Sequence, residues 1–273
     1  MKFTNKSFLY YLSNILMVIG IYFFVTSDDW DKAEYIYIPL LILSFFLTVF
    51  NYYKSTKSRA ANLSEYAKQN ELIFAEEPEQ EQIDEFRAFK AVKGIAGYRN
   101  SDFSNILVPQ GYRTSNKGIK PKIITGRLEI GGGQHSSEYF TQIFLYEIDH
   151  VLPIFYLLSK NKYESLIPFS NKISSMKKNN LGMKNYQKLE INNYDFPSKR
   201  YDLYSPDLNA KNVFNREFID LLKTGIKKNV GIHIESNGNK LIFFIKNQRH
   251  SPEGLDFYTN LFEVMIAKLK NRF

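Results

Sequence analysis

The sequence contains no cysteine and only four histidines among its 273 residues. Without thiols the protein has no disulfide bond, no cysteine nucleophile and no zinc site built on thiolates. The histidines, at positions 135, 150, 233 and 250, do not occur in the HExxH spacing of a zinc hydrolase or in any other metal-ligand pattern. We therefore expect no cofactor and consider binding a better expectation than catalysis.

Acidic residues are the minority charge: 28 Asp and Glu face 36 Lys and Arg, for a formal charge of +8. This excess leaves nucleic acid, an anionic membrane surface and an uncharged partner open. Hydrophobic residues make up 44% of the chain and aromatic residues 16%, enough to bury a large core. Disorder throughout the chain is excluded.

Charge is also absent from two long apolar runs near the amino terminus, Phe8–Thr26 and Tyr35–Tyr53, each of 19 residues. At about 1.5 Å per helical residue, each run has roughly the thickness of a bilayer core. Only eight residues separate the runs, so the pattern predicts a transmembrane helical hairpin. A cleaved signal peptide is the alternative, but the end of the first run lacks a small-x-small site.

The charges flanking these runs predict an orientation. Lys2 and Lys6 precede the first run, whereas Lys54, Lys57 and Arg59 follow the second, and the connecting turn is acidic. The positive-inside rule then predicts a multi-pass membrane protein with two helices and with both termini in the cytoplasm.

The rest of the chain is expected to form a helical and acidic connector over residues 55–95 and a cytoplasmic α+β domain over residues 96–273, after the hairpin of residues 1–54. Lys122–Ile130 and Tyr139–His150 are rich in β-branched and aromatic residues and predict a hairpin. Val151–Leu158 predicts a further extended segment, which Pro153 places at an edge, a bulge or a strand end. The fold class is therefore an antiparallel sheet packed with helices, which we expect on one face of the sheet, preceded by the membrane hairpin.

The strongest local signal is Asn237-Gly238 between two apolar runs, VGIHIE and KLIFFIK, which predicts a β-hairpin with a type I′ turn. Two Ser-Pro-acid sequences, beginning at Ser205 and Ser251, predict helix starts because serine caps, proline suits the first turn and the acid favours the helix dipole. The apolar stripe after Pro252 predicts a helix that packs on the sheet.

Several short motifs together resemble a bacterial family of membrane-anchored proteins of unknown function. They are Phe86-x-x-Phe89, the segment from His135 to Gln142, Leu152–Leu157, and Phe196-x4-Tyr201-x-Leu203-x3-Asp207. The resemblance implies two amino-terminal spans and a cytoplasmic α+β domain, and it supplies no catalytic residue.

Two groups of acids and histidines are candidates for chemistry. Glu147 and Asp149 share one face of a predicted strand next to His150, so a metal-dependent hydrolase is one alternative function if histidines converge there. His233 and Glu235 share a face of the other hairpin, where we expect a polar outer surface. The glycine-rich loop before His135 leads into a strand, so it does not fit a phosphate-binding loop.

A lysine-rich segment provides the other alternative. Residues 171–188 contain five lysines and no acid, and lysines near a membrane attract anionic headgroups. The candidate lipid contacts are Lys172, Lys177, Lys178, Lys184 and Lys188. We expect a membrane-anchored binding or scaffold module, with a protein partner or an anionic lipid as the ligand; nucleic acid is disfavoured because arginine is scarce there.

Overall fold

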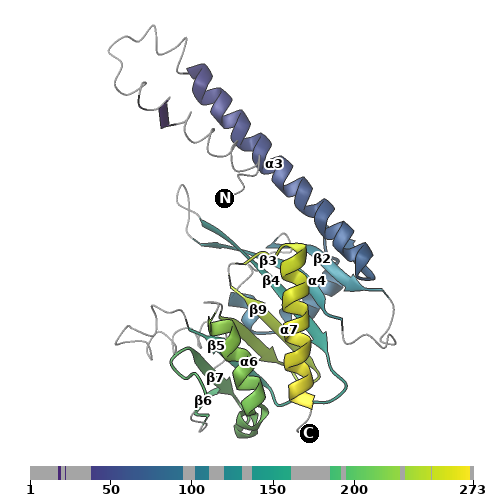
Figure 1. The fold of residues 1–273 in the computed structure, drawn as a ribbon, viewed down its shortest axis with the longest axis vertical. Helices are drawn as coiled ribbons and strands as arrows, with labels where there is room; N and C mark the ends of the chain where they lie inside the picture. Colours follow the sequence, from purple (N-terminus) through teal and green to yellow (C-terminus); the bar gives the residue numbers. More distant parts are fainter. Residues whose placement is uncertain are drawn as a thin grey trace. The chain divides into compact units, whose positions relative to one another are not determined.

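A computed structural model describes residues 18, 19, 22, 38–94, 102–110, 120–130, 137–160, 185–191, 195–227, 231–246 and 248–270 (Figure 1). The chain divides into two compact units, Met1–Asn62 and Leu63–Phe273. The helix α3 (Ile38–Gln69) begins in the first unit and ends in the second.

The second unit is built on one sheet of nine strands, all of whose pairings are antiparallel. The spatial order is β1-β2-β3-β4-β9-β8-β5-β7-β6. The strands, in chain order, are β1 Leu72–Ala75, β2 Phe103–Pro109, β3 Lys122–Ile130, β4 Ser137–Glu147, β5 Phe155–Ser159, β6 Gln187–Leu189, β7 Tyr201–Ser205, β8 Ile232–Ser236 and β9 Lys240–Ile245. The predicted α+β class, with an antiparallel sheet and packed helices, is confirmed for this unit.

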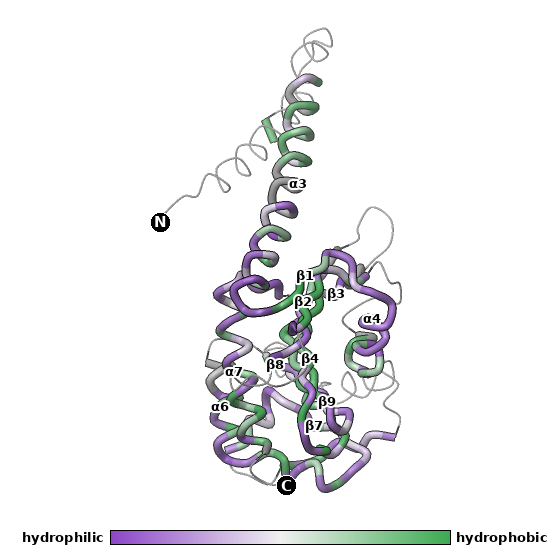
Figure 2. Tube along the Cα trace, turned by 90° about the vertical axis from the view of Figure 1, so that its right-hand side faces the viewer, coloured by the Kyte–Doolittle hydropathy of each residue, from purple (hydrophilic) through white to green (hydrophobic). Residues whose placement is uncertain are grey.

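Two helices, α6 (Arg216–Lys227) and α7 (Pro252–Lys270), cover one face of the sheet, which we call the first face (Figure 2). The last turns of α3 contribute Leu63 and Tyr66 to the same core. Phe262 of α7 is fully buried there, with its ring stacked 4.6 Å from that of Phe243 and edge-on to that of Phe144 at 5.1 Å. These aromatic contacts fix α7 on the centre of the sheet.

The opposite, second face is covered by α4 (Gln80–Arg87) and the short 3₁₀ helix η2 (Ala91–Gly94) (Figure 2). Phe86 and Phe89 from this segment are fully buried against strand residues such as Ile124 and Phe244. We expected helices on one face only, so the coverage of both faces is a correction. The coverage of both faces explains why β9 has the sequence KLIFFI, with apolar residues at consecutive positions. A central strand covered on both faces of the sheet needs apolar side chains on both faces.

The two predicted hairpins form, and one turn differs from the prediction. β3 pairs with β4, and β8 pairs with β9. In the second hairpin Asn237 pairs with Lys240 through an N–H to carbonyl hydrogen bond of 2.9 Å, so the loop is Gly238-Asn239. Only Gly238 has a positive φ there, of 74°. A single positive φ at the first central residue is the pattern of a type II′ turn, and the predicted type I′ turn is wrong.

The two Ser-Pro starts also have different outcomes. α7 begins at Pro252 as predicted, and Ser251 Oγ accepts the Gly254 N–H at 3.3 Å. After Pro206, however, the chain forms a 3₁₀ helix, η6 (Leu208–Val213), capped by Asp207. The α-helix begins only at Arg216, where Asn215 Oδ1 accepts the Phe218 N–H at 2.8 Å. A second capping residue thus divides what we predicted as one helix.

The predicted two-span membrane protein with both termini in the cytoplasm is not supported and is corrected here. Among the helices that the described residues form, none is long and apolar enough to cross a membrane. The described part of the second apolar run does not form a helix of its own, because α3 continues without a break through Lys57, Arg59 and Glu65. Most of the first run, Phe8–Thr26, lies outside the described residues.

Candidate functional site

Of the five candidate lipid-contact lysines, only Lys188 lies within the described residues; Lys172, Lys177, Lys178 and Lys184 lie outside them. Lys188 is on the edge strand β6, and its Nζ is 2.8 Å from Oδ1 of Asp202. The Asp202 side chain is 3% exposed and is also 3.1 Å from Lys160 Nζ. Lys188 therefore compensates a buried carboxylate, and an anionic headgroup would compete with Asp202 for it. Lipid binding by the other four lysines stays a prediction.

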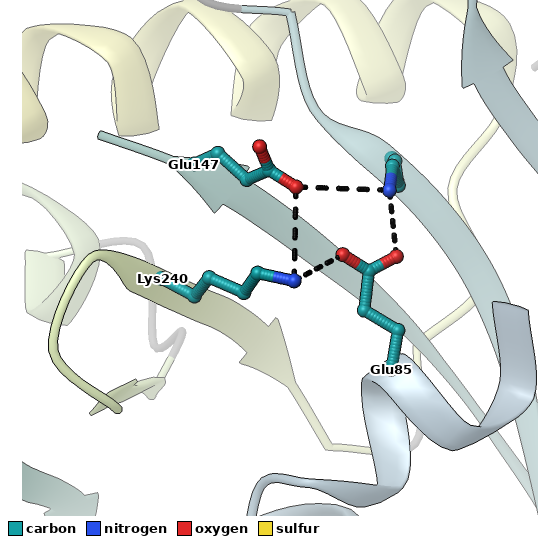
Figure 3. Close-up of polar contacts among 4 residues, drawn as sticks. Glu85, Glu147 and Lys240 are labelled. Atoms are coloured by element: carbon teal, nitrogen blue, oxygen red, sulfur yellow. Dashed lines mark hydrogen bonds and ion pairs between the residues drawn. The ribbon is translucent and has the colours of Figure 1, made fainter. Parts of the chain in front are cut away.

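Glu147 lies in a network of four charged side chains on the second face (Figure 3). Its Oε1 is 3.8 Å from Lys122 Nζ and 3.7 Å from Lys240 Nζ. Glu85 of α4 contacts the same two lysines, at 2.6 Å each. The four side chains alternate in charge around a square, so the network holds α4 against β3, β4 and β9.

The network also sets the charge state of Glu85. Burial raises the pKa of its carboxyl, but the hydrogen bonds and charges of Lys122 and Lys240 outweigh burial and hold that pKa below its ordinary value. The same two ammonium groups surround Glu147. A metal cation at Glu147 would have to displace them, which opposes the ligand role considered for this residue.

The other residues considered for a metal-dependent hydrolase are dispersed. Asp149 and His150 follow the end of β4, whereas His250 is 6% exposed between the rings of Phe144 and Tyr258. His135 lies outside the described residues. Within the described ranges no group of three or more His, Asp or Glu side chains could hold a metal ion. The hydrolase stays a prediction without support from these residues.

The most unusual carboxyl group is that of Glu235, the residue before the last of β8. The residue is 2% exposed, and its two carboxylate oxygens accept the backbone N–H groups of Lys90 at 2.9 Å and Ala91 at 2.7 Å. Burial raises the pKa of Glu235 to about 7, although these hydrogen bonds and the charge of Lys90 lower it in part. Glu235 thus ties the start of η2 to the sheet.

His233 and two strand tyrosines extend this cluster along the second face. The imidazole of His233 stacks on Phe244 with ring centroids 4.8 Å apart. Its Nδ1 accepts the backbone N–H of Ser159 at 3.3 Å and lies 3.3 Å from the hydroxyl of Tyr156. Burial, together with the charges of Glu235 and Tyr204, raises the pKa of Tyr156 well above its ordinary value. The tyrosine therefore stays protonated at neutral pH.

We expected His233 and Glu235 on a polar outer surface, and this is wrong: both are buried, Glu235 under the segment that leads into η2 and His233 against the ring of Phe244. Sequence reasoning missed the cluster because it treated the strands as alternating between one apolar and one polar face. The signal available was β9, whose apolar residues at consecutive positions indicate that both faces are covered.

A different kind of feature occupies the first unit. Seven large apolar side chains on the first half of α3 are 41–67% exposed. In Figure 2 these turns are mostly green, whereas the later turns of the helix are mostly purple. Ser44, by contrast, is 2% exposed, and the hydroxyl of Thr48 donates a hydrogen bond of 2.9 Å to the backbone carbonyl of Ser44. The seven residues, called the α3 apolar face below, are Ile38, Ile42, Leu43, Phe45, Phe46, Val49 and Phe50.

Comparisons of this chain with protein families, with curated proteins and with solved structures find no match. This overturns the resemblance to a membrane-anchored bacterial family. The motifs behind that resemblance are packing residues: Phe86, Phe89 and Leu157, for example, are fully buried. Such apolar spacings occur wherever helices pack on an antiparallel sheet, so they do not identify a family.

Proposed function

We propose that this chain acts by binding another protein through the α3 apolar face. The observation that carries the proposal is the exposure of seven large apolar side chains on one short stretch of helix. Contiguous apolar patches of more than a few hundred Å² are rare on monomers and mark interaction sites. Partners that dock on a helix face through apolar residues spaced three and four apart are a common recognition mode.

The polar clusters of the second unit support binding over catalysis. A catalytic acid or base must reach a proton on a substrate. Both oxygens of Glu235 instead receive backbone N–H groups, and Glu147 lies between two lysines. These carboxylates hold structural elements together, whereas the seven residues of the α3 apolar face are 41–67% exposed.

The proposal is tested by measuring whether the α3 apolar face is covered when other proteins are present. Because the chain has no cysteine, Phe46→Cys introduces a single thiol that a water-soluble maleimide can label. Leu208→Cys is the matched control, since Leu208 is 62% exposed on η6, close to the 63% of Phe46. Labelling rates are compared in a membrane-free extract of the producing cells.

We expect the thiol at position 46 to react at least about tenfold more slowly than the thiol at 208, because an interface excludes the reagent. Equal rates at the two positions would show that no protein covers the face and would overturn the proposal. Urea-unfolded samples of both variants give the reference rate for each thiol.

A further inference from the structure

The α3 apolar face has a defined shape. At about 100° per helical residue, its seven members span roughly 160° of the helix circumference, with Phe45 and Leu43 at the two limits. Ile42 and Phe46 lie near the middle of this arc. Ser44 and Thr48 lie on the other side of the helix, where Ser44 is buried. The face is therefore a broad strip along one side of α3.

The exposed area of this strip is close to that of one side of a protein interface. A whole large apolar side chain offers about 150–250 Å², so at the observed exposures the seven side chains present roughly 700 Å². A standard interface buries about 800 Å² on each partner. One helix face of the same size and apolar character is therefore enough to cover the α3 apolar face, and no other part of a partner is needed.

The distribution of charge along α3 favours a second copy of the chain whose helix runs antiparallel to the first. Residues 38–50 carry no charge, so two such faces meet without repulsion in spite of the net charge of +8. Lys54, Lys57 and Arg59 follow immediately. In a parallel pair each of these residues would lie beside its own copy, which is unfavourable. In an antiparallel pair centred on Ser44, the two copies of Lys54 are about 30 Å apart, well beyond the Debye length.

We propose that the partner of the α3 apolar face is a second copy of this chain, bound as an antiparallel, two-fold symmetric helix pair centred near Ser44. This inference rests on the proposed function and names its partner. In a two-fold pair the same patch serves both copies, so a self-complementary uncharged face suits it. Ile42 of one copy then lies level with Phe46 of the other, at the middle of both faces.

The experiment uses cysteine cross-linking and sedimentation of the full-length chain. An oxidised mixture of the Ile42→Cys and Phe46→Cys variants is compared with Ile38→Cys alone. In the antiparallel pair positions 42 and 46 face each other, whereas the two copies of position 38 are about 18 Å apart, too far for a disulfide. We expect the mixed pair to cross-link at least about fivefold more than Ile38→Cys alone, because disulfides form only between adjacent side chains.

Sedimentation measures the dissociation constant of the dimer. Phe46→Asp should raise it at least about 100-fold, because a charge at the centre of an apolar interface is desolvated without a partner. Leu208→Asp, a control on an equally exposed residue of the second unit, should leave it unchanged. Phe46 is 63% exposed, so its replacement leaves the fold intact, and circular dichroism verifies this.

The remaining outcomes separate this inference from the proposed function. Self cross-linking of Ile38→Cys indicates a parallel pair and overturns the antiparallel arrangement. A chain that stays monomeric, while position 46 is protected in the extract, overturns the second copy but leaves a different protein partner. A monomeric chain that floats with phosphatidylcholine vesicles, and is unprotected in the membrane-free extract, overturns both proposals.

Discussion

The first half of α3 and the nine-stranded unit use apolar residues in opposite ways. In the second unit Phe262, Phe243 and Phe144 are fully buried, and the sheet is covered on both faces. In the first half of α3 the phenylalanines at 45, 46 and 50 are more than half exposed, whereas the polar residue Ser44 is buried. The second unit is therefore stabilised by its own core, whereas the described start of α3 presents apolar side chains on its surface.

The largest predicted effect is the difference in stability between two phenylalanine substitutions, one in each region. Phe262→Ala removes a fully buried ring from between Phe243 and Phe144 and should lower the free energy of unfolding by about 3–5 kcal/mol. Phe45→Ala removes a ring that is 67% exposed and should change that free energy by less than about 1 kcal/mol. Urea denaturation followed by circular dichroism measures both.

The control is to work at a concentration low enough to keep the chain monomeric, since association would stabilise the wild type alone. If Phe45→Ala were as costly as Phe262→Ala in the monomer, the α3 apolar face would belong to the core of the chain and the comparison would fail.

A second prediction concerns a polar residue that the nine-stranded unit buries. The pKa of Glu235 is raised to about 7, above the ordinary value of 4.5, so the folded chain binds a proton there that the unfolded chain releases. The stability that this proton supplies is fully present below about pH 4.5 and is lost as the pH rises through 7. The loss corresponds to roughly 3 kcal/mol between these limits.

Glu235→Gln tests this prediction, because glutamine has nearly the same shape and does not titrate. The free energy of unfolding, measured by urea denaturation from pH 5 to pH 8, should decline less steeply for the variant than for the wild type. Glu77→Gln, an exposed glutamate, is the matched control. Parallel pH profiles for wild type and Glu235→Gln would contradict the raised pKa.

The two regions also differ in how well the sequence predicts them. The hairpins β3–β4 and β8–β9 and the helix α7 follow from local signals: β-branched residues, a glycine turn and a Ser-Pro start. β1 was missed because its four residues, Leu72–Ala75, form a strand only by pairing with the distant β2. Long-range pairing of this kind leaves no local pattern.

The clusters on the second face could not be predicted for the same reason. Glu235 accepts hydrogen bonds from Lys90 and Ala91, which are 145 and 144 positions away in the sequence. Glu85 contacts Lys240, which is 155 positions away. Local periodicity does not contain such contacts. In α3 the apolar run itself was visible, but a local pattern cannot say what covers it, and the predicted membrane spans were the wrong conclusion.

The smallest predicted effect concerns the ion-pair network of Figure 3. The lysines and Glu147 in this network are about one-third exposed, so solvent screens their charges and each pair contributes little. Glu85 is 15% exposed and contacts both lysines, and Glu85→Gln should cost about 1 kcal/mol. Because the pKa of Glu85 is lowered, its contribution is present above the ordinary carboxyl pKa and is lost as the pH falls. This pH dependence has the opposite sign to that of Glu235.

The difference in unfolding free energy between wild type and Glu85→Gln should therefore shrink when urea denaturation is repeated at pH 3 or in about 1 M salt, where charges are screened over about 3 Å. A difference that persists unchanged in both conditions would mean that Glu85 acts through the packing of its side chain and not through its charge.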